Sequence, residues 1–106
     1  MMKENAPPEV SVGQAIGART STQIVDVREP DEWTEGHIAG AVHIPLGDLL
    51  QRAGELDPNR PVVTVCHLGG RSLIAAEALS NAGFQDVASM AGGMAAWEDA
   101  GQPITR

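Results

Sequence analysis

Short runs of β-branched residues alternate along this chain with segments of helical spacing, and this alternation restricts the possible folds more than any other feature. The runs cover residues 24–27, 42–44, 62–65 and 87–90. Each run is followed by a segment that has either helix-start signals or apolar residues spaced at the interval of an α-helix. Strand–helix–strand units of this kind form parallel sheets with helices on both faces. The sequence therefore predicts a three-layer α/β/α fold with a mainly parallel sheet.

Helix signals lie between these strands. Ser11 and Gln14 form the Ser-x-x-Gln pattern of a capping box, which predicts a short helix after Ser11. Pro30, followed by two acidic residues, suits a first helical turn that ends near Gly36. Apolar spacing indicates three further helices, carried by Leu46, Leu49, Leu50 and Ala53, by Ala75, Ala78, Leu79 and Ala82, and by Met94 and Trp97.

The length of 106 residues fits one compact domain. We expect residues 1–9 to form a flexible leader, because Pro7 and Pro8 discourage regular structure, and residues 10–106 to form the domain. A single cysteine excludes an intrachain disulfide, so the chain does not resemble a secreted disulfide scaffold. No apolar run approaches the roughly 18 residues of a membrane span, and a cytoplasmic location is expected.

The formal net charge of −7 argues against whole classes of partner. A nucleic-acid-binding protein would carry a basic stripe, and an anionic membrane surface would repel this chain. The acidity instead favours solubility, and it is compatible with a basic protein partner. An anionic substrate would have to be held by local groups against the overall field.

The segment from residue 62 to residue 79 carries the strongest chemical signal. Cys66 directly follows a predicted buried strand, and Gly69, Gly70 and Arg71 lead into a helix. Ligands bind at the carboxyl ends of strands in open α/β sheets, and a helix N-terminus there offers free N–H groups. Such surroundings lower a cysteine pKa and favour the thiolate. This loop alone is compatible with a phosphatase, a reductase or a sulfur-transferring enzyme.

Three ordered motifs make the chain similar to the rhodanese family of sulfurtransferases. The loop resembles the family pattern Cys-x-x-Gly-x-Arg-Ser, through Cys66, Gly69, Arg71 and Ser72. The other two motifs are Asp26-Val27-Arg28 with Glu32-Trp33 and Gly36-His37-Ile38-Ala39-Gly40-Ala41, and Gly92-Gly93-Met94-Ala95-Ala96-Trp97. Together they run from about residue 24 to residue 99. The resemblance implies a twisted parallel sheet of about five strands.

The resemblance also implies a reaction and its residues. Cys66 would be the nucleophile that takes a sulfane sulfur from thiosulfate or a persulfide and passes it to cyanide, a thiol or a protein. The loop residues that would bind the substrate are His67, Leu68, Gly69, Gly70, Arg71 and Ser72. No metal or organic cofactor is required. Only four residues separate Cys66 from Arg71, whereas cysteine phosphatases and arsenate reductases have five, so those activities are disfavoured.

Two further functions use the same fold. A sulfur carrier or partner-binding module would relay sulfur between proteins, with little turnover of small molecules. A silent interaction domain is disfavoured, because silent versions often lose the cysteine that is retained here as Cys66. His67 also stands where members that use thiosulfate often have a basic residue, so a persulfidated protein is an alternative donor.

The remaining polar candidates are expected to be structural. Asp26 and Arg28 leave the end of their strand on the same side, beside the active loop. We expect them to steady the loop through an ion-pair network from Arg28 to Glu32 or Asp31, without direct chemistry. The spacing of His37, His43 and Cys66 matches no common zinc pattern, so no metal site is predicted.

Overall fold

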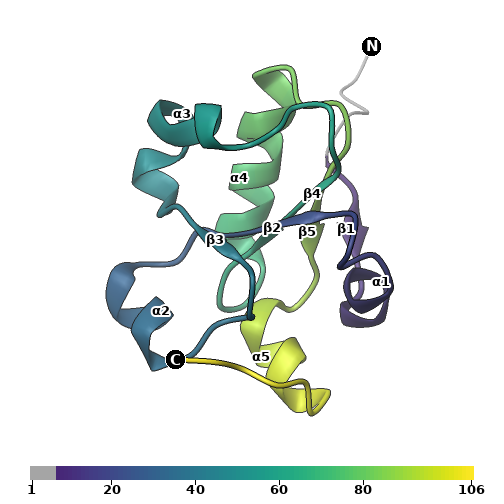
Figure 1. Ribbon diagram of the computed structural model, residues 1–106, viewed down its shortest axis with the longest axis vertical. Coiled ribbons are helices and arrows are strands. Elements are labelled where there is room, and N and C mark those ends of the chain that lie inside the picture. Colours follow the sequence, from purple (N-terminus) through teal and green to yellow (C-terminus); the bar gives the residue numbers. More distant parts are fainter. Residues whose placement is uncertain (1–6) are drawn as a thin grey trace.

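A five-stranded parallel sheet forms the centre of the molecule in the computed structural model, which describes residues 7–106. The strand order is β1-β5-β4-β2-β3, and every neighbouring pair is parallel (Figure 1). The strands are β1 (Glu9–Val10), β2 (Gln23–Asp26), β3 (Val42–His43), β4 (Val62–Val65) and β5 (Val87–Met90). The predicted fold class is therefore confirmed.

The helices form one layer on each face of this sheet. On one face, α3 (Leu49–Arg52) and α4 (Gly70–Asn81) cover a core that includes Val25, Val62, Cys66 and Leu79. On the other face, α1 (Val12–Gly17) and α5 (Gly93–Asp99) cover a second core that includes Ile24, Val65, Met90 and Trp97. Both layers are visible in Figure 1. Successive residues of a strand point to opposite faces, so both cores draw on the same strands.

The helix α2 (Pro30–Glu35) lies at the edge of the sheet where the strands end. It begins as predicted, with Pro30 in its first turn, and its cap residue Glu29 forms a capping box with Glu32. Gly36 ends it, and the next residue, His37, forms an antiparallel bridge with Thr105. The C-terminal segment is thereby held beside α2.

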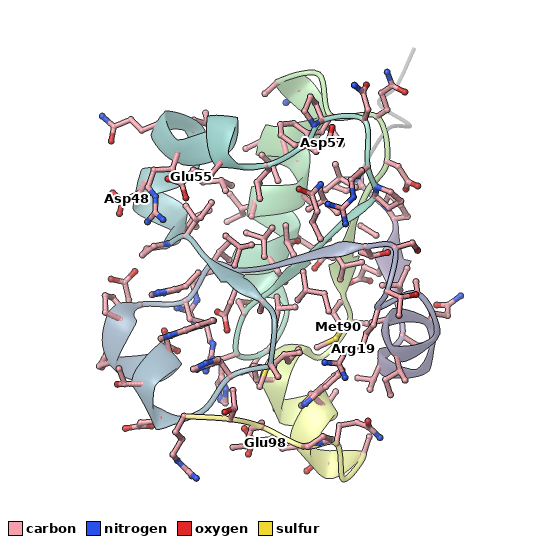
Figure 2. All side chains as sticks on the ribbon, viewed as in Figure 1. Arg19, Asp48, Glu55, Asp57, Met90 and Glu98 are labelled. Carbon is pink, nitrogen blue, oxygen red and sulfur yellow. The ribbon has the colours of Figure 1, made fainter. Side chains whose placement is uncertain are left out.

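Arg19, which follows α1, contacts α5 on the same face of the sheet. Its guanidinium lies 5.9 Å from the centroid of the Trp97 ring, and its Nη2 donates to the Ala39 carbonyl. Figure 2 shows Arg19 beyond the end of α1, on the side of the molecule that carries α5. None of the helices in the described part of the chain is long and apolar enough to cross a membrane.

The predicted helix over Leu46, Leu49, Leu50 and Ala53 differs from the structure. The segment forms a 3₁₀ turn (Leu46–Asp48), the single α-helical turn α3 and a second 3₁₀ turn (Ala53–Glu55). Leu50, expected in the core, has 61% of its surface exposed. Gly47 and Gly54 lie within the two 3₁₀ turns, and glycine is a poor helix former, which accounts for the break in a regular apolar face.

The boundary of the predicted leader is also shifted. Glu9, placed in the leader by the sequence, belongs to β1 and pairs with Ser89 of β5. The Pro8 carbonyl accepts a hydrogen bond from the Ser89 N–H group. The ordered fold therefore begins before residue 10. Residues 1–6, which make up most of the predicted leader, lie outside the described residues.

Candidate active site

The loop that follows β4 places Cys66 at the carboxyl end of a central strand, as predicted. All four residues of β4 are buried, and Cys66 itself has 1% of its surface exposed. Gly69 takes a φ of +113°, a left-handed conformation that suits glycine, and the chain then enters α4 at Gly70. This turn folds the loop back over the sulfur atom.

Neutral hydrogen-bond donors surround the sulfur. The Gly69 N–H group donates to Cys66 Sγ over 3.1 Å, and Ser72 Oγ lies 3.4 Å from the same atom. Burial alone would raise the pKa of the Cys66 thiol, but hydrogen bonds from the Ser72 hydroxyl and from the N–H groups of Ser72, Gly69 and Leu68 outweigh it and lower the pKa. The loop therefore favours a thiolate at Cys66.

The N-terminal turn of α5 holds the other side of this loop. The Met94 N–H group donates to the Cys66 carbonyl over 2.8 Å, and the Ala95 N–H group donates to the His67 carbonyl over 3.0 Å. A trans peptide points its C=O and N–H groups in opposite directions, so the N–H groups of His67 and Leu68 face away from α5. The third sequence motif thus orients the active loop.

Arg71 is engaged by a carboxylate of α2. Its two terminal nitrogens donate to the two carboxylate oxygens of Glu32, over 2.7 and 2.9 Å. This contact is the main cause that lowers the pKa of Glu32 to about 2, against an opposing effect of burial. The positive charge of Arg71 is thus paired with Glu32, and this ion pair joins α2 to the active loop.

Asp26 and Arg28 lie near the loop but on the other side of the sheet from the sulfur. Asp26 pairs in register with Val65, the residue before Cys66, so its side chain leaves the opposite face. Arg28 donates from Nε and Nη2 to the Asp26 carboxylate and from Nη1 and Nη2 to the carbonyls of Glu32 and Gly36. The expected ion pair of Arg28 with the Glu32 or Asp31 carboxylate is wrong, since its carboxylate partner is Asp26.

A cleft of about 540 Å³ lies beside the loop, and His67 is the predicted substrate-binding residue that lines it. The charged residues that line the cleft are Arg28, Glu32, Glu35, Glu98 and Arg106, and Figure 2 shows Glu98 on α5. The cleft thus carries charges of both signs. Gly70 and Leu68 do not line it, although Gly70 is exposed and Leu68 has 67% of its surface exposed.

Comparison of the sequence with models of known protein families shows the family to which the chain belongs. The family model described as "Rhodanese-like domain" matches residues 11–100, a span that contains all three motifs and the loop around Cys66. The chain belongs to the rhodanese-like family. The matched span includes β2 to β5 and every helix described above.

Named relatives and a solved structure support this membership. The chain is 41% identical to YrkF of Bacillus subtilis, provisionally named a sulfur carrier protein, and spans 54% of its length. It is 42% identical to the thiosulfate sulfurtransferase GlpE of Shewanella oneidensis over 76% of this chain and 79% of that one. A rhodanese-related crystal structure from Thermoplasma volcanium superposes with a TM-score of 0.87 at 28% identity, covering 92% of this chain and 97% of the other.

Two residues of this rhodanese-like site were not recognised as site residues from the sequence. The sequence places Glu32 in the second motif and as a partner for Arg28, but nothing in a local pattern shows that Arg71, 39 positions later, reaches it. The sequence places Ser89 only within the predicted strand over residues 87–90, yet its hydroxyl lies 2.7 Å from Ser72 Oγ. A lone hydroxyl in a run of buried residues is the signal that was available for Ser89.

The histidines expected to be structural do form structural contacts. His37 and His43 both stack on Trp33, with ring centroids 3.5 and 4.7 Å away. Their ring nitrogens lie 2.8 Å from the carbonyls of Trp33 and Arg28, respectively. Within residues 7–106, no group of three or more His, Cys, Asp or Glu side chains is arranged to hold a metal ion.

Proposed function

We propose that this protein is a sulfurtransferase that carries a sulfane sulfur as a persulfide on Cys66. The observation that carries the proposal is the buried Cys66 Sγ, within hydrogen-bonding distance of the Gly69 N–H group and the Ser72 hydroxyl. A thiolate is the nucleophilic form of cysteine, and these contacts favour it. The named sulfurtransferase among the relatives supports the same chemistry.

The reaction proceeds in two displacements. The Cys66 thiolate attacks the outer sulfur of the donor, a new S–S bond forms, and the S–S bond of the donor breaks. Thiosulfate leaves as sulfite with the bonding electron pair. A thiophilic acceptor such as cyanide or a thiolate then attacks the outer sulfur of the persulfide and releases the Cys66 thiolate. No external oxidant or reductant is consumed, and covalent catalysis divides the transfer into two steps.

The loop residues divide the supporting roles in this proposal. The backbone N–H groups of His67, Leu68, Gly69 and Gly70 stabilise the negative charge on the persulfide or on the donor oxygens. When Cys66 is a thiolate, the Ser72 hydroxyl, 3.4 Å from the sulfur, donates to it. Outside this cradle, Arg71 fixes the loop to α2 through Glu32. Arg28, paired with Asp26, holds the C-terminal end of α2 from the opposite face. They act on the loop without touching the reacting sulfur.

A sulfur-relay module is the second candidate, and the net charge of the protein favours it. The net charge of −7 repels a dianion such as thiosulfate. A persulfide on another protein or on a small thiol carries less negative charge. The provisional name of YrkF supports the same alternative. Both candidates need a free thiol, which is maintained in a reducing compartment such as the cytoplasm.

Intact-mass measurement of the purified protein tests the proposal. After incubation with thiosulfate, we expect the mass to rise by one sulfur atom, the gain to disappear on addition of cyanide, and Cys66→Ser to show no gain. Loading by a persulfidated protein but not by thiosulfate would select the relay module. Failure of every sulfane-sulfur donor to modify Cys66 would refute both candidates.

A further inference from the structure

Three hydroxyl groups lie fully buried beneath the active loop. They belong to Thr64 on β4, Ser72 on α4 and Ser89 on β5, and each side chain is fully inaccessible to solvent. A buried hydroxyl destabilises a protein unless it is hydrogen-bonded. Their partners therefore indicate what each hydroxyl contributes.

The hydroxyl of Ser72 has more neighbours than it has hydrogens. Ser72 Oγ lies 3.4 Å from Cys66 Sγ, 3.1 Å from the Gly69 carbonyl oxygen and 2.7 Å from Ser89 Oγ. A serine hydroxyl donates one hydrogen and accepts through two lone pairs. Its single hydrogen can therefore point to the sulfur, to the Gly69 carbonyl or to Ser89, and only the first direction stabilises a Cys66 thiolate.

The position of Ser89 resolves part of this competition. Within the described residues, Ser72 Oγ is the hydrogen-bond partner that the Ser89 side chain has. If Ser89 donates, Ser72 Oγ becomes the acceptor and its own hydrogen is excluded from that direction. The choice that remains lies between the Gly69 carbonyl and Cys66 Sγ, and an anionic acceptor attracts the hydrogen more strongly than a neutral one.

We propose that Ser89 is a positioning residue that donates to Ser72 Oγ and so directs the Ser72 hydrogen to the Cys66 thiolate. Hydrogen bonds in such a chain also strengthen one another by polarisation. When Cys66 is protonated, the hydrogen bond between Cys66 and Ser72 changes direction. The thiol then donates to Ser72 Oγ, and the Ser72 hydroxyl donates to the Gly69 carbonyl. This inference rests on the proposed function, because only a reactive thiolate gives the chain a catalytic consequence.

The alkylation rate of Cys66 as a function of pH tests the inference. Iodoacetamide reacts with the thiolate, so the midpoint of the profile follows the pKa of Cys66. We expect Ser89→Ala to shift the profile to higher pH and to reduce the thiolate population below the midpoint by about threefold, the effect of a modest hydrogen bond. Ser72→Ala is expected to shift it further.

A double-mutant cycle separates positioning from a general structural effect. If Ser89 acts through Ser72, then Ser89→Ala has no additional effect on the profile in the Ser72→Ala background. An unchanged profile for Ser89→Ala alone, or an equal shift in both backgrounds, would overturn the inference. Persulfide loading of the unaltered protein is measured first, because its failure would refute the proposed function rather than the role of Ser89.

Thr64→Val provides a matched control. Thr64 is as deeply buried as Ser89, but its hydroxyl donates to the carbonyl of Ser72, over 2.7 Å, and not to the Ser72 hydroxyl. The substitution is therefore expected to lower the free energy of unfolding and to leave the alkylation midpoint in place. A midpoint shift as large as that of Ser89→Ala would show that loss of any buried hydroxyl beneath the loop raises the pKa of Cys66. That result would also contradict the inference.

Discussion

At the scale of single residues, neutral hydrogen-bond donors are the main groups that lower the pKa of the Cys66 thiol. Burial raises the pKa of its thiol, and hydroxyl and N–H donors more than reverse the effect. The positive charge of Arg71 is instead committed to Glu32. Hydrogen bonds from neutral donors require close contact, so the thiolate is sensitive to small displacements of the loop.

The Glu32–Arg71 contact predicts a defined dependence of stability on pH. The pKa of Glu32 is lowered from 4.5 to about 2 in the folded protein. A lowered carboxyl pKa stabilises the fold above the unfolded value, and this contribution is lost as the pH falls toward the folded value. We therefore expect the stability difference between the unaltered protein and Glu32→Gln to be largest above about pH 4.5 and to vanish near pH 2.

Chemical denaturation at a series of pH values measures this difference. Glu55→Gln serves as the control, because Glu55 pairs with Arg52 at an exposed site where both side chains keep at least 40% of their surface accessible. Exposed pairs contribute little, so its stability difference should be small at every pH. A Glu32→Gln difference that does not change between pH 7 and pH 3 would contradict the predicted role of the ion pair.

At the scale of elements, the contact between α5 and the active loop needs a glycine. Gly93 has a φ of +58°, and a Cβ atom there would lie 2.3 Å from the Cys66 carbonyl oxygen. The strain of a left-handed alanine adds to that of an overpacked contact. We expect Gly93→Ala to lower the free energy of unfolding by about 2–5 kcal/mol and to slow persulfide formation.

Gly101 offers a comparison just beyond the other end of the same helix. Its φ is +74°, but no atom lies within 4 Å of the position of an added Cβ. Gly101→Ala is thus expected to destabilise by only about 1–2 kcal/mol and to leave sulfur loading unchanged. Urea denaturation and intact-mass kinetics measure both effects. Equal losses in the two variants would show that backbone strain alone, and not the contact with the loop, determines the outcome.

The buried pair of Asp26 and Arg28 joins β2 to α2. Removal of one partner leaves an uncompensated buried charge, so Arg28→Ala is expected to lower the free energy of unfolding by about 3–5 kcal/mol. Arg52→Ala, which removes an exposed pair with Glu55 and a hydrogen bond to the His43 carbonyl, should lower it much less. Denaturation curves of the two variants measure both losses of unfolding free energy. Similar losses would argue against the structural importance of Arg28.

The same elements show how far the sequence determines the site. The active loop and its flanking strand and helix were predictable because their signals are local: a buried run, a glycine turn and a helix start. The break around α3 was not, since Leu46, Leu49 and Leu50 have a regular apolar spacing that Gly47 and Gly54 disrupt. The partners of Arg71 and Ser72 come from α2 and β5, and contacts between distant segments leave no local pattern.

At the scale of the whole molecule, acidic residues occur at both ends. Figure 2 shows Asp48, Glu55 and Asp57 toward one end and Glu98 at the other. The net charge is −7, so the surrounding field repels anions from most directions. Under the proposed function, thiosulfate would approach the loop against this field.

This field predicts that salt accelerates loading by thiosulfate. The Debye length falls from about 30 Å at 0.01 M to about 8 Å at 0.15 M ionic strength, which screens the repulsion. We expect the second-order rate of persulfide formation to rise severalfold over this range. Alkylation by neutral iodoacetamide reports on the same thiolate and should change little. A thiosulfate rate that falls with salt would indicate that a local positive potential governs the approach.

The bridge between His37 and Thr105 has a practical consequence for handling the protein. It leads the last residue, Arg106, to the rim of the cleft, where its Nε donates to the Glu35 carbonyl. A bulky label attached at Arg106 would therefore lie at that rim and hinder the access of large molecules to the cleft. Because the strands are parallel, β1 begins at the opposite end of the sheet from Cys66. A label attached at the start of β1 is therefore expected to interfere less with the cleft.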